Sequence, residues 1–147
     1  MGLRPAGVTL AIEHHIAGGS LVPKTVPNLP GLEPGALPFS KVVEANGFVF
    51  LAGQVGDIPG THGPVPGGIE AETRAMLENV GRLLHAVGLD YSDVVKCTVY
   101  LREFGDFAAM NSVYREYFPS EPPTRATVGV TALAENCRVE IEVMAAR

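Results

Sequence analysis

The fold is decided near the C-terminus by two stretches, Thr124-Arg125-Ala126-Thr127-Val128-Gly129-Val130 and Cys137-Arg138-Val139-Glu140-Ile141-Glu142-Val143-Met144. Both alternate apolar and polar residues, which predicts strands with one buried face. Side chains alternate between the faces of a strand, so Arg125 lies on one face of the first strand, and Glu140 and Glu142 lie on the polar face of the second. If the two strands are neighbours, the arginine and both carboxylates share one surface. That surface is a candidate small-anion pocket with a general base beside it.

Upstream of these strands, the chain predicts a hairpin, two helices and a further strand. Asn46-Gly47 separates two short apolar runs, which is the strongest short hairpin signal. Apolar residues at helical spacing predict a first helix that Gly88 ends. Asp106 is placed to cap a second helix, which Pro119 ends. The predicted segments are strands 41–45, 48–53 and 94–101, helices 69–87 and 106–118, and the two C-terminal strands.

This order of elements, written β-β-α-β-α-β, predicts an α/β sandwich in which two helices cover one face of a mixed sheet. The other face carries Lys96, Thr98 and Tyr100 from one strand, and Glu140 and Glu142 from the last. It is neither an apolar core nor a fully charged surface. We therefore expect a homo-oligomer that buries this face and places its sites at subunit boundaries.

Composition divides the chain into two regions. Residues 1–37 are rich in Gly and Pro and predict an extended arm, with a possible short strand at Val8–Ile12. Residues 38–147 predict a single domain, and a chain of 147 residues is long enough to bury a core. The arm could cover or line a cleft.

Charge and residue types exclude several function classes. The net charge of −5 argues against a broad basic surface for nucleic acid. No apolar run reaches the length of about 18 residues that a membrane span needs. Cys97 and Cys137 form neither a disulfide framework nor a zinc motif, and the adjacent pair His14-His15 lacks a third metal ligand. We expect no metal, no cofactor, no membrane partner and a cytoplasmic location.

A few polar residues could carry chemistry, and each also has an ordinary structural explanation. The Arg125 guanidinium fork suits a carboxylate, although a strand arginine more often pairs with a surface glutamate. Glu140 could act as a general base or orient a water, although a strand glutamate is more often simply solvated. Asn111 on the second helix and Gln54 at a strand end could contact a ligand. None of these residues is sufficient evidence alone.

An ordered series of motifs over residues 38–144 resembles the RidA family, also called YjgF or L-PSP. The motifs are Pro38-Phe39-Ser40, Val49-Phe50-Leu51-Ala52-Gly53-Gln54-Val55, Glu72-Thr73-Arg74, Leu77-Glu78-Asn79, Val94-Val95-Lys96-Cys97-Thr98-Val99-Tyr100-Leu101, Asp106-Phe107-Ala108-Ala109-Met110-Asn111, Pro123-Thr124-Arg125 and Val139-Glu140-Ile141-Glu142. No single piece is decisive, but the series is specific.

The resemblance implies a chorismate-mutase-like fold and a homotrimer with three clefts between subunits. It also implies cofactor-free hydrolysis of reactive enamine or imine acids, such as 2-aminoacrylate, to 2-oxo acids and ammonia. The family's carboxylate-binding arginine matches Arg125, and its catalytic glutamate matches Glu140, not Glu142. Asn111 matches a pocket asparagine. Gly53 and Gln54 match the strand that forms the pocket wall.

Three positions depart from the family pattern. The family often has Tyr where this chain has Phe39, Ser where it has Ala52, and Cys where it has Thr127. Two hydroxyls that could position water or substrate are absent, and Thr127 returns one on the face of Arg125. These changes leave the carboxylate anchor intact, and leave open the water network, the preferred substrate and whether activity is kept.

Three functions remain open on the sequence. The first is an imine/enamine deaminase, and the second is a noncatalytic trimer that binds a carboxylate metabolite. Arg125 suits both, whereas Glu140 favours the enzyme. The third is the ribonuclease activity attached to the family name, which the acidic charge and the lack of a basic-aromatic surface disfavour.

Overall fold

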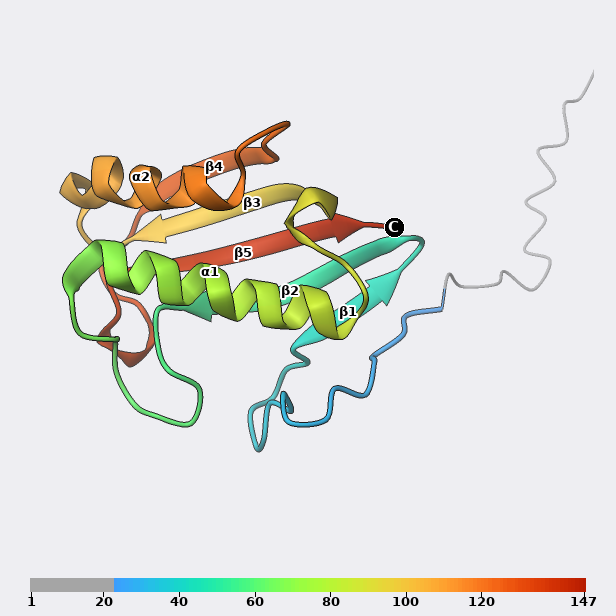
Figure 1. The fold of residues 1–147 in the computed structure, drawn as a ribbon. Helices are drawn as coiled ribbons and strands as arrows, with labels where there is room; N and C mark the ends of the chain where they lie inside the picture. The colour runs from blue at the N-terminus through green and yellow to red at the C-terminus, as the bar shows by residue number, and fades with distance from the viewer. Residues whose placement is uncertain (1–22) are drawn as a thin grey trace, which may run out of the picture.

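The computed structural model describes residues 23–147, which form one mixed five-stranded sheet and two main helices (Figure 1). The predicted strand Val8–Ile12 and the pair His14-His15 lie outside the described residues. The elements are β1 (Val42–Ala45), β2 (Phe48–Val55), α1 (Gly68–Ala86), β3 (Val94–Leu101), α2 (Phe107–Tyr117), β4 (Thr124–Gly129) and β5 (Val139–Ala146).

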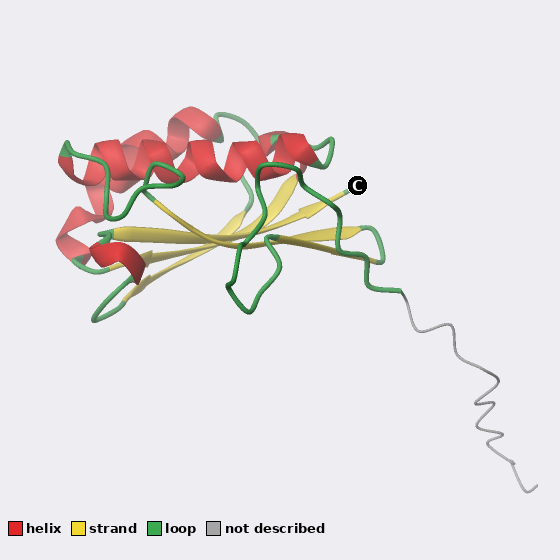
Figure 2. Ribbon diagram, turned by 90° about the horizontal axis from the view of Figure 1, so that it is seen from below, coloured by secondary structure: helices red, strands yellow, loops and turns green. Residues whose placement is uncertain are grey.

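The strands lie in the order β1-β2-β5-β3-β4, so the last strand of the chain is the central one. Only β3 and β4 pair in parallel, and every other neighbouring pair is antiparallel. Both main helices lie on one side of the sheet, as Figure 2 shows. The prediction of a mixed sheet with two helices on one face is confirmed.

The predicted order of elements was one strand short. The observed order is β-β-α-β-α-β-β, because the two C-terminal stretches form separate strands on opposite sides of β3. Arg125 and Glu140 were expected on one surface on the condition that the two C-terminal strands are neighbours, and this condition is wrong. A parallel β3–β4 pair needs a crossover, which α2 supplies, and β5 then returns antiparallel along the other edge of β3.

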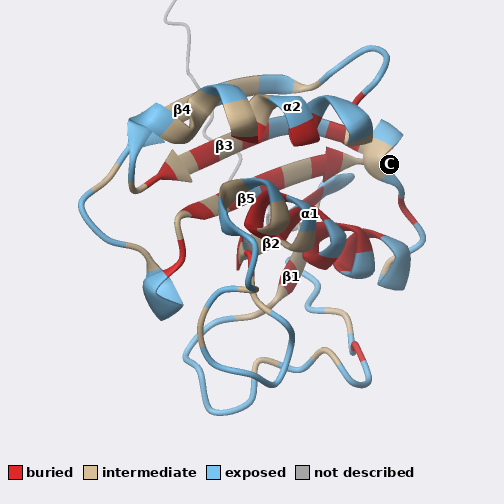
Figure 3. Cartoon of the chain, turned by 60° about the vertical axis from the view of Figure 1, so that its left-hand side comes forward, coloured by how far each residue is buried: buried red, intermediate tan, exposed pale blue. Residues whose placement is uncertain are grey.

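The core lies between the helices and the sheet. Alternate strand residues are buried against the apolar stripe of α1, and the buried segments of Figure 3 follow these two layers. The largest fully buried side chains are Met76, Leu77, Leu84, Leu101, Met110, Ile141, Val42, Val49, Val80, Val99, Val139 and Val143. This core is complete within one chain and fixes the strand faces on which the candidate site is built.

Two local signals are confirmed. Asn46 and Gly47 both have positive φ, 50° and 79°, as a tight primed hairpin turn requires. Gly88 has φ 76°, and its N–H donates to the carbonyl oxygen of His85 at 3.0 Å, which closes the C-terminus of α1.

The capping role expected of Asp106 is wrong. Asp106 stands at the N-cap position of α2, but its side chain makes no capping hydrogen bond. Its two carboxylate oxygens instead accept from Arg138 Nε and Nη2, both at 2.9 Å. A bidentate arginine is a stronger partner for a carboxylate than a single backbone N–H. The pair ties the start of α2 to the start of β5.

The strand β2 contains a bulge that shapes the sheet's open face. Leu51 pairs with Val143 and Gln54 with Ile141, so Ala52 and Gly53 together oppose Glu142 alone. Two consecutive residues therefore project from the same face of the strand. Both line the cavity that contains Glu140.

The end of the predicted arm contacts the domain. Thr25 and Glu44 exchange two backbone hydrogen bonds of 2.8 Å beside β1, and Leu29 is buried in the core cluster. The division of the chain at residue 38 stays a prediction. Within residues 23–147, no helix is both long and apolar enough to cross a lipid bilayer.

Candidate functional site

Glu140 lies on the open face of the sheet, at the wall of a cavity of about 420 Å³. The register places it opposite Tyr100 of β3, and places Glu142 opposite Thr98. All four side chains therefore belong to the face that the helices leave uncovered. The cavity is lined by Leu51, Ala52, Gly53, Tyr100, Leu133, Glu140 and Glu142.

The two carboxylates of this cavity differ in their surroundings. Glu142 is exposed, and its Oε2 accepts a hydrogen bond from the Tyr100 hydroxyl at 3.0 Å. Glu140 is half-buried, and no residue within 23–147 donates a hydrogen bond to its carboxylate. Burial, and secondarily the negative charge of Glu142, raise the pKa of Glu140. Of the two carboxylates, Glu140 therefore has the raised pKa, and Glu142 is held by a hydrogen-bond partner.

Because Gly53 has no side chain, the Glu140 carboxylate can occupy the space beside it. A Cβ at this position would lie 2.2 Å from Glu140 Oε1, closer than any real contact. The glycine and the carboxylate therefore fit as a pair, and the β2 bulge aims both at the cavity. This close approach is the physical reason for a residue without a side chain at position 53.

Arg125 lies on the other face of the sheet. It pairs with Cys97 of β3, whose side chain is fully buried beneath the helices. Its guanidinium carbon lies 4.5 Å from the ring centre of Tyr114 and 5.8 Å from that of Phe107, both residues of α2. The guanidinium is therefore held between a strand at the sheet edge and the helix above it.

Asn111 and Thr127 lie beside this arginine. Asn111 follows Phe107 by four positions and precedes Tyr114 by three, so the three share one side of α2. Thr127 pairs with the buried Val99 and so shares the face of Arg125, as predicted. The sequence therefore places an amide and a hydroxyl near the guanidinium.

The structure corrects the expectation that Arg125 and Glu140 share one surface of one chain. Strand β3 separates β4 from β5, and Arg125 shares a cross-strand row with Cys97 and Val143. Glu140 is three residues from Val143, an odd number, so its side chain faces the other way. Within one chain the two groups lie on opposite faces, and the cavity of Glu140 is not lined by Arg125.

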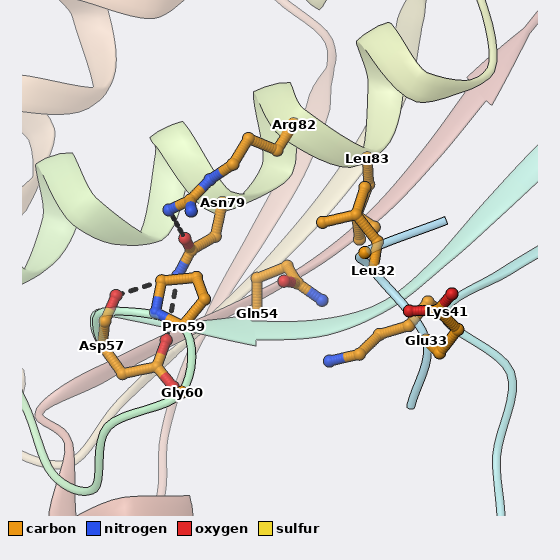
Figure 4. A pocket seen from close by; sticks show the side chains of 11 residues that line it. Leu32, Glu33, Lys41, Gln54, Asp57, Pro59, Gly60, Asn79, Arg82 and Leu83 are labelled. Carbon is orange, nitrogen blue, oxygen red and sulfur yellow. Dashed lines mark hydrogen bonds between the residues drawn. The ribbon is translucent and has the colours of Figure 1, made fainter. Parts of the chain in front are cut away.

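Gln54 is also displaced from the Glu140 cavity. It lies on the helix side of β2 and lines a second cavity of about 260 Å³, together with Lys41, Asn79 and Arg82 (Figure 4). Its amide nitrogen donates to the carbonyl oxygens of Ala52 and Gly53 at 2.9 Å each. The bulge sets the direction of Gln54. Simple alternation from Leu51 would turn Gly53 toward the helices and Gln54 toward the open face, whereas the bulge gives Gly53 the open face and Gln54 the helix side.

The polar groups of the second cavity mostly bond one another. Asn79 Nδ2 donates to Asp57 Oδ1 at 2.9 Å and to the carbonyl oxygen of Val55 at 3.0 Å, while Arg82 donates to Asn79 Oδ1. Figure 4 shows the contacts of Asn79 with Asp57 and Arg82, which join α1 to the loop that follows β2. They stabilise the loop geometry and leave few groups free for a ligand.

Phe39 precedes β1 and is 47% exposed, with Lys41 Nζ 5.9 Å from its ring centre. It lines neither the Glu140 cavity nor the second cavity within this chain. Among residues 23–147, no three His, Cys, Asp or Glu side chains are grouped to hold a metal ion. The absence of a metal or cofactor stays a prediction.

Sequence reasoning missed three supporting groups. Tyr114 and Phe107 of α2 contact Arg125, and no role was predicted for either residue from the sequence. Arg138 was also missed: its N–H donates to Glu72 Oε2 at 2.7 Å, and its guanidinium binds Asp106. These contacts fix the chain two residues before Glu140. The signal available in the sequence was that Arg138, a charged residue, lies two positions before the candidate base Glu140.

Known proteins resemble this chain over most of its length. A family profile described as "Endoribonuclease L-PSP" matches residues 32–147. The chain is 44% identical over 113 residues to "Reactive Intermediate Deaminase A, chloroplastic" of Arabidopsis thaliana, a match covering 76% of this chain and 60% of that protein. It is 43% identical over 108 residues to the "2-iminobutanoate/2-iminopropanoate deaminase" of Capra hircus, covering 74% and 79%.

A solved structure agrees with these sequence matches. It is E. coli TdcF with bound serine, which superposes with a TM-score of 0.71 at 36% identity and covers 78% of this chain and 93% of that one. The match to the plant protein spans less than two thirds of that protein's length. The profile match, the identities and the shared fold together establish that this chain belongs to the RidA (YjgF/L-PSP) family.

Proposed function

We propose that this protein hydrolyses reactive imine and enamine acids of the 2-aminoacrylate type to 2-oxo acids and ammonia, without a cofactor. The observation that carries the proposal is the Glu140 carboxylate, half-buried, with a raised pKa and free of hydrogen-bond donors within residues 23–147. A carboxylate in that state can take a proton from water near neutral pH. The names of the goat and plant relatives support the substrate class.

In the proposed mechanism, binding and chemistry are assigned to different groups. The Arg125 fork binds the substrate carboxylate and so places the imine carbon. Acting on the protonated imine, Glu140 accepts a proton from water as the water oxygen bonds to that carbon and the C=N π electrons move to nitrogen, which gives a neutral carbinolamine. Glu140 then returns this proton to nitrogen, and the C–N bond breaks as the hydroxyl proton passes to Glu140 and the carbonyl forms. Glu140 finally releases that proton to ammonia or solvent. The products are ammonia and a 2-oxo acid.

A site that uses both residues requires two chains, since Arg125 and Glu140 lie on opposite sheet faces of one chain. We therefore propose a homotrimer in which Arg125 of one subunit meets Glu140 of the next, giving three equivalent sites. The open face supports this assembly, because Phe48, Phe50 and Val128 are between 38% and 43% exposed there. Association would remove their apolar area from water.

Noncatalytic carboxylate binding is the second candidate. The observation that favours it is the bound serine in the TdcF structure, together with Phe39 and Ala52, which lack hydroxyls that could position a water. A binding protein needs Arg125 but has no use for the raised pKa of Glu140. The ribonuclease named in the family description is disfavoured by the net charge of −5.

The decisive assay generates 2-iminobutanoate in situ from an amino acid and an oxidase, and follows its disappearance with and without the protein. We expect hydrolysis to 2-oxobutanoate to accelerate with protein concentration. No acceleration, together with saturable binding of 2-oxobutanoate, would establish the noncatalytic candidate instead.

Mixing two inactive variants tests the shared site. Arg125→Ala and Glu140→Gln are each expected to lose turnover. Refolding them together should restore about a quarter of wild-type activity, because a site is intact when a chain that keeps Arg125 precedes one that keeps Glu140. If both residues acted within one chain, every site would keep one defect, and mixing would restore nothing.

A further inference from the structure

We propose that Tyr114 and Phe107 position the Arg125 guanidinium by clamping its flat face, so that its N–H fork stays free for the substrate carboxylate. This inference rests on the proposed function and adds two positioning residues to it. It makes α2 part of substrate binding and not only a cover for the sheet.

The distances place the guanidinium within reach of both rings. The Arg125 Cζ lies 4.5 Å from the Tyr114 ring centre and 5.8 Å from the Phe107 ring centre. Both values fall within the range of about 6 Å over which a cation is attracted to an aromatic face. Tyr114 is only 5% exposed, so water competes little with this contact.

The partners of Arg125 differ from those of Arg74 and Arg138. Arg74 and Arg138 are paired with Glu116 and Asp106, which occupy their N–H groups. Among residues 23–147, no carboxylate lies within ion-pair distance of Arg125. Burial raises the pKa of the Tyr114 hydroxyl, and the Arg125 guanidinium lies close enough to that hydroxyl to oppose the rise in part. Rings contact the face of a guanidinium, whereas its five N–H donors point outward in its plane. Aromatic contacts therefore hold the cation without occupying its donors.

Each ring of the clamp is itself supported by a second ring. Phe118 lies 4.7 Å behind Tyr114, and Phe104 stacks on Phe107 with centres 5.3 Å apart and planes 17° from parallel. The Tyr114 hydroxyl is buried beside Cys97 and Arg125 but makes no well-aligned hydrogen bond within residues 23–147. Packing, not hydrogen bonding, therefore fixes the Tyr114 ring, and the ring alone should be sufficient for its role.

The test compares Tyr114→Leu with Tyr114→Phe. The leucine variant loses the ring, and we expect KM for the imino acid and Kd for 2-oxobutanoate to rise roughly three- to thirtyfold, with kcat changed much less. The phenylalanine variant keeps the ring and should recover both constants. Tyr117→Leu is the matched control, since Tyr117 belongs to α2 but its ring packs on Tyr91, 5.2 Å away.

Three outcomes would overturn the clamp: unchanged KM and Kd in a folded Tyr114→Leu protein, equal losses in Tyr117→Leu, or no recovery with phenylalanine. If Tyr114→Leu fails to fold, Phe107→Leu decides the question, because Phe107 is only half-buried. Its Kd for 2-oxobutanoate should then rise, and an unchanged value contradicts the clamp.

The test also separates the clamp from the proposed function. If the wild-type protein shows no turnover, the deaminase proposal fails. The clamp is then still judged by the Kd of 2-oxobutanoate in the same three variants.

Discussion

The two faces of the sheet differ in what one chain provides for them. The helix-covered face is a finished core, and Arg125 at its edge is held by two aromatic rings. The open face combines Glu140 and Glu142 with exposed phenylalanines, and nothing within residues 23–147 covers it. A single chain thus completes its fold on one side and leaves the other side to association.

This difference also divides the proposed chemistry. Arg125, which we propose binds the substrate carboxylate, belongs to the helix-covered face, and Glu140, which we propose activates water, belongs to the open one. Substitutions on the two faces should therefore change different kinetic constants. The predictions below test that separation, from the largest expected effect to the smallest.

The largest effect is expected on the open face, at Glu140. Glu140→Gln keeps the shape of the side chain and an acceptor oxygen but removes the base, so kcat should fall by roughly 10²–10⁴-fold while 2-oxobutanoate binding is retained. Steady-state kinetics and calorimetry measure the two effects. Glu142→Gln is the control and should be nearly silent at neutral pH, because Glu142 is held by Tyr100. Equal losses at both positions would indicate general electrostatics of the strand.

On the helix-covered face, Arg125→Ala should weaken binding. A hydrogen bond to a charged group contributes about 1.5–3 kcal/mol, so losing even one contact should raise the Kd of 2-oxobutanoate roughly 10- to 150-fold. Arg125→Lys should recover only part of this affinity, since an ammonium lacks the planar fork. Wild-type turnover in the alanine variant would show that the substrate carboxylate binds elsewhere.

Two glycine-to-alanine substitutions in β2 and just after it separate activity from stability. At Gly53 the added methyl meets the mobile end of Glu140, so turnover should fall on the order of tenfold with little change in the thermal midpoint. At Gly56 the methyl meets backbone atoms of Glu72 at 2.4 and 2.7 Å, so stability should fall by about 1–3 kcal/mol. Similar unfolding curves for the two variants would contradict this distinction.

The smallest effect is a shift in pH dependence. Glu140 must be ionised to act as a base, so activity is full above its pKa and lost as pH falls through it. Because burial and then Glu142 raise that pKa, the acidic limb of the kcat profile should lie above the ordinary glutamate range. Glu142→Gln removes the second cause and should move the limb to lower pH. If the acidic limb of the kcat profile does not move in Glu142→Gln, burial alone raises the pKa of Glu140, and the contribution of Glu142 is contradicted.

The sequence predicted the elements of this fold because each depends on local signals. Asn46-Gly47 specified its turn, and helical spacing specified α1 to within a residue or two of its ends. The faces of individual strands were also predictable, since alternation is a local property. Arg125, Thr127, Glu140 and Asn111 were therefore assigned to the correct strand or helix, whereas Gln54, predicted just beyond its strand, lies within β2.

Pairing between strands could not be predicted in the same way. Whether β4 neighbours β5 depends on the path of the whole chain, and the insertion of β3 between them moved Arg125 and Glu140 apart. The bulge in β2 likewise changed the direction of Gln54 by one added residue. The contacts of Phe107 and Tyr114 with Arg125 were missed because aromatic residues on a helix have the same spacing whether they pack on an arginine or on the core.

The bulge at Ala52 and Gly53 has a consequence for length variation. Strand β2 alternates faces up to Leu51, and Gln54 resumes on the same side as Leu51, so one of the two bulge residues is surplus to the register. Deleting either residue would restore simple alternation, with every other side chain of β2 on its present face. A deletion elsewhere in β2 would move the side chains on one side of the deletion to the opposite face of the sheet. This short segment is therefore the place where the wall of the Glu140 cavity can lose a residue without the core being rebuilt.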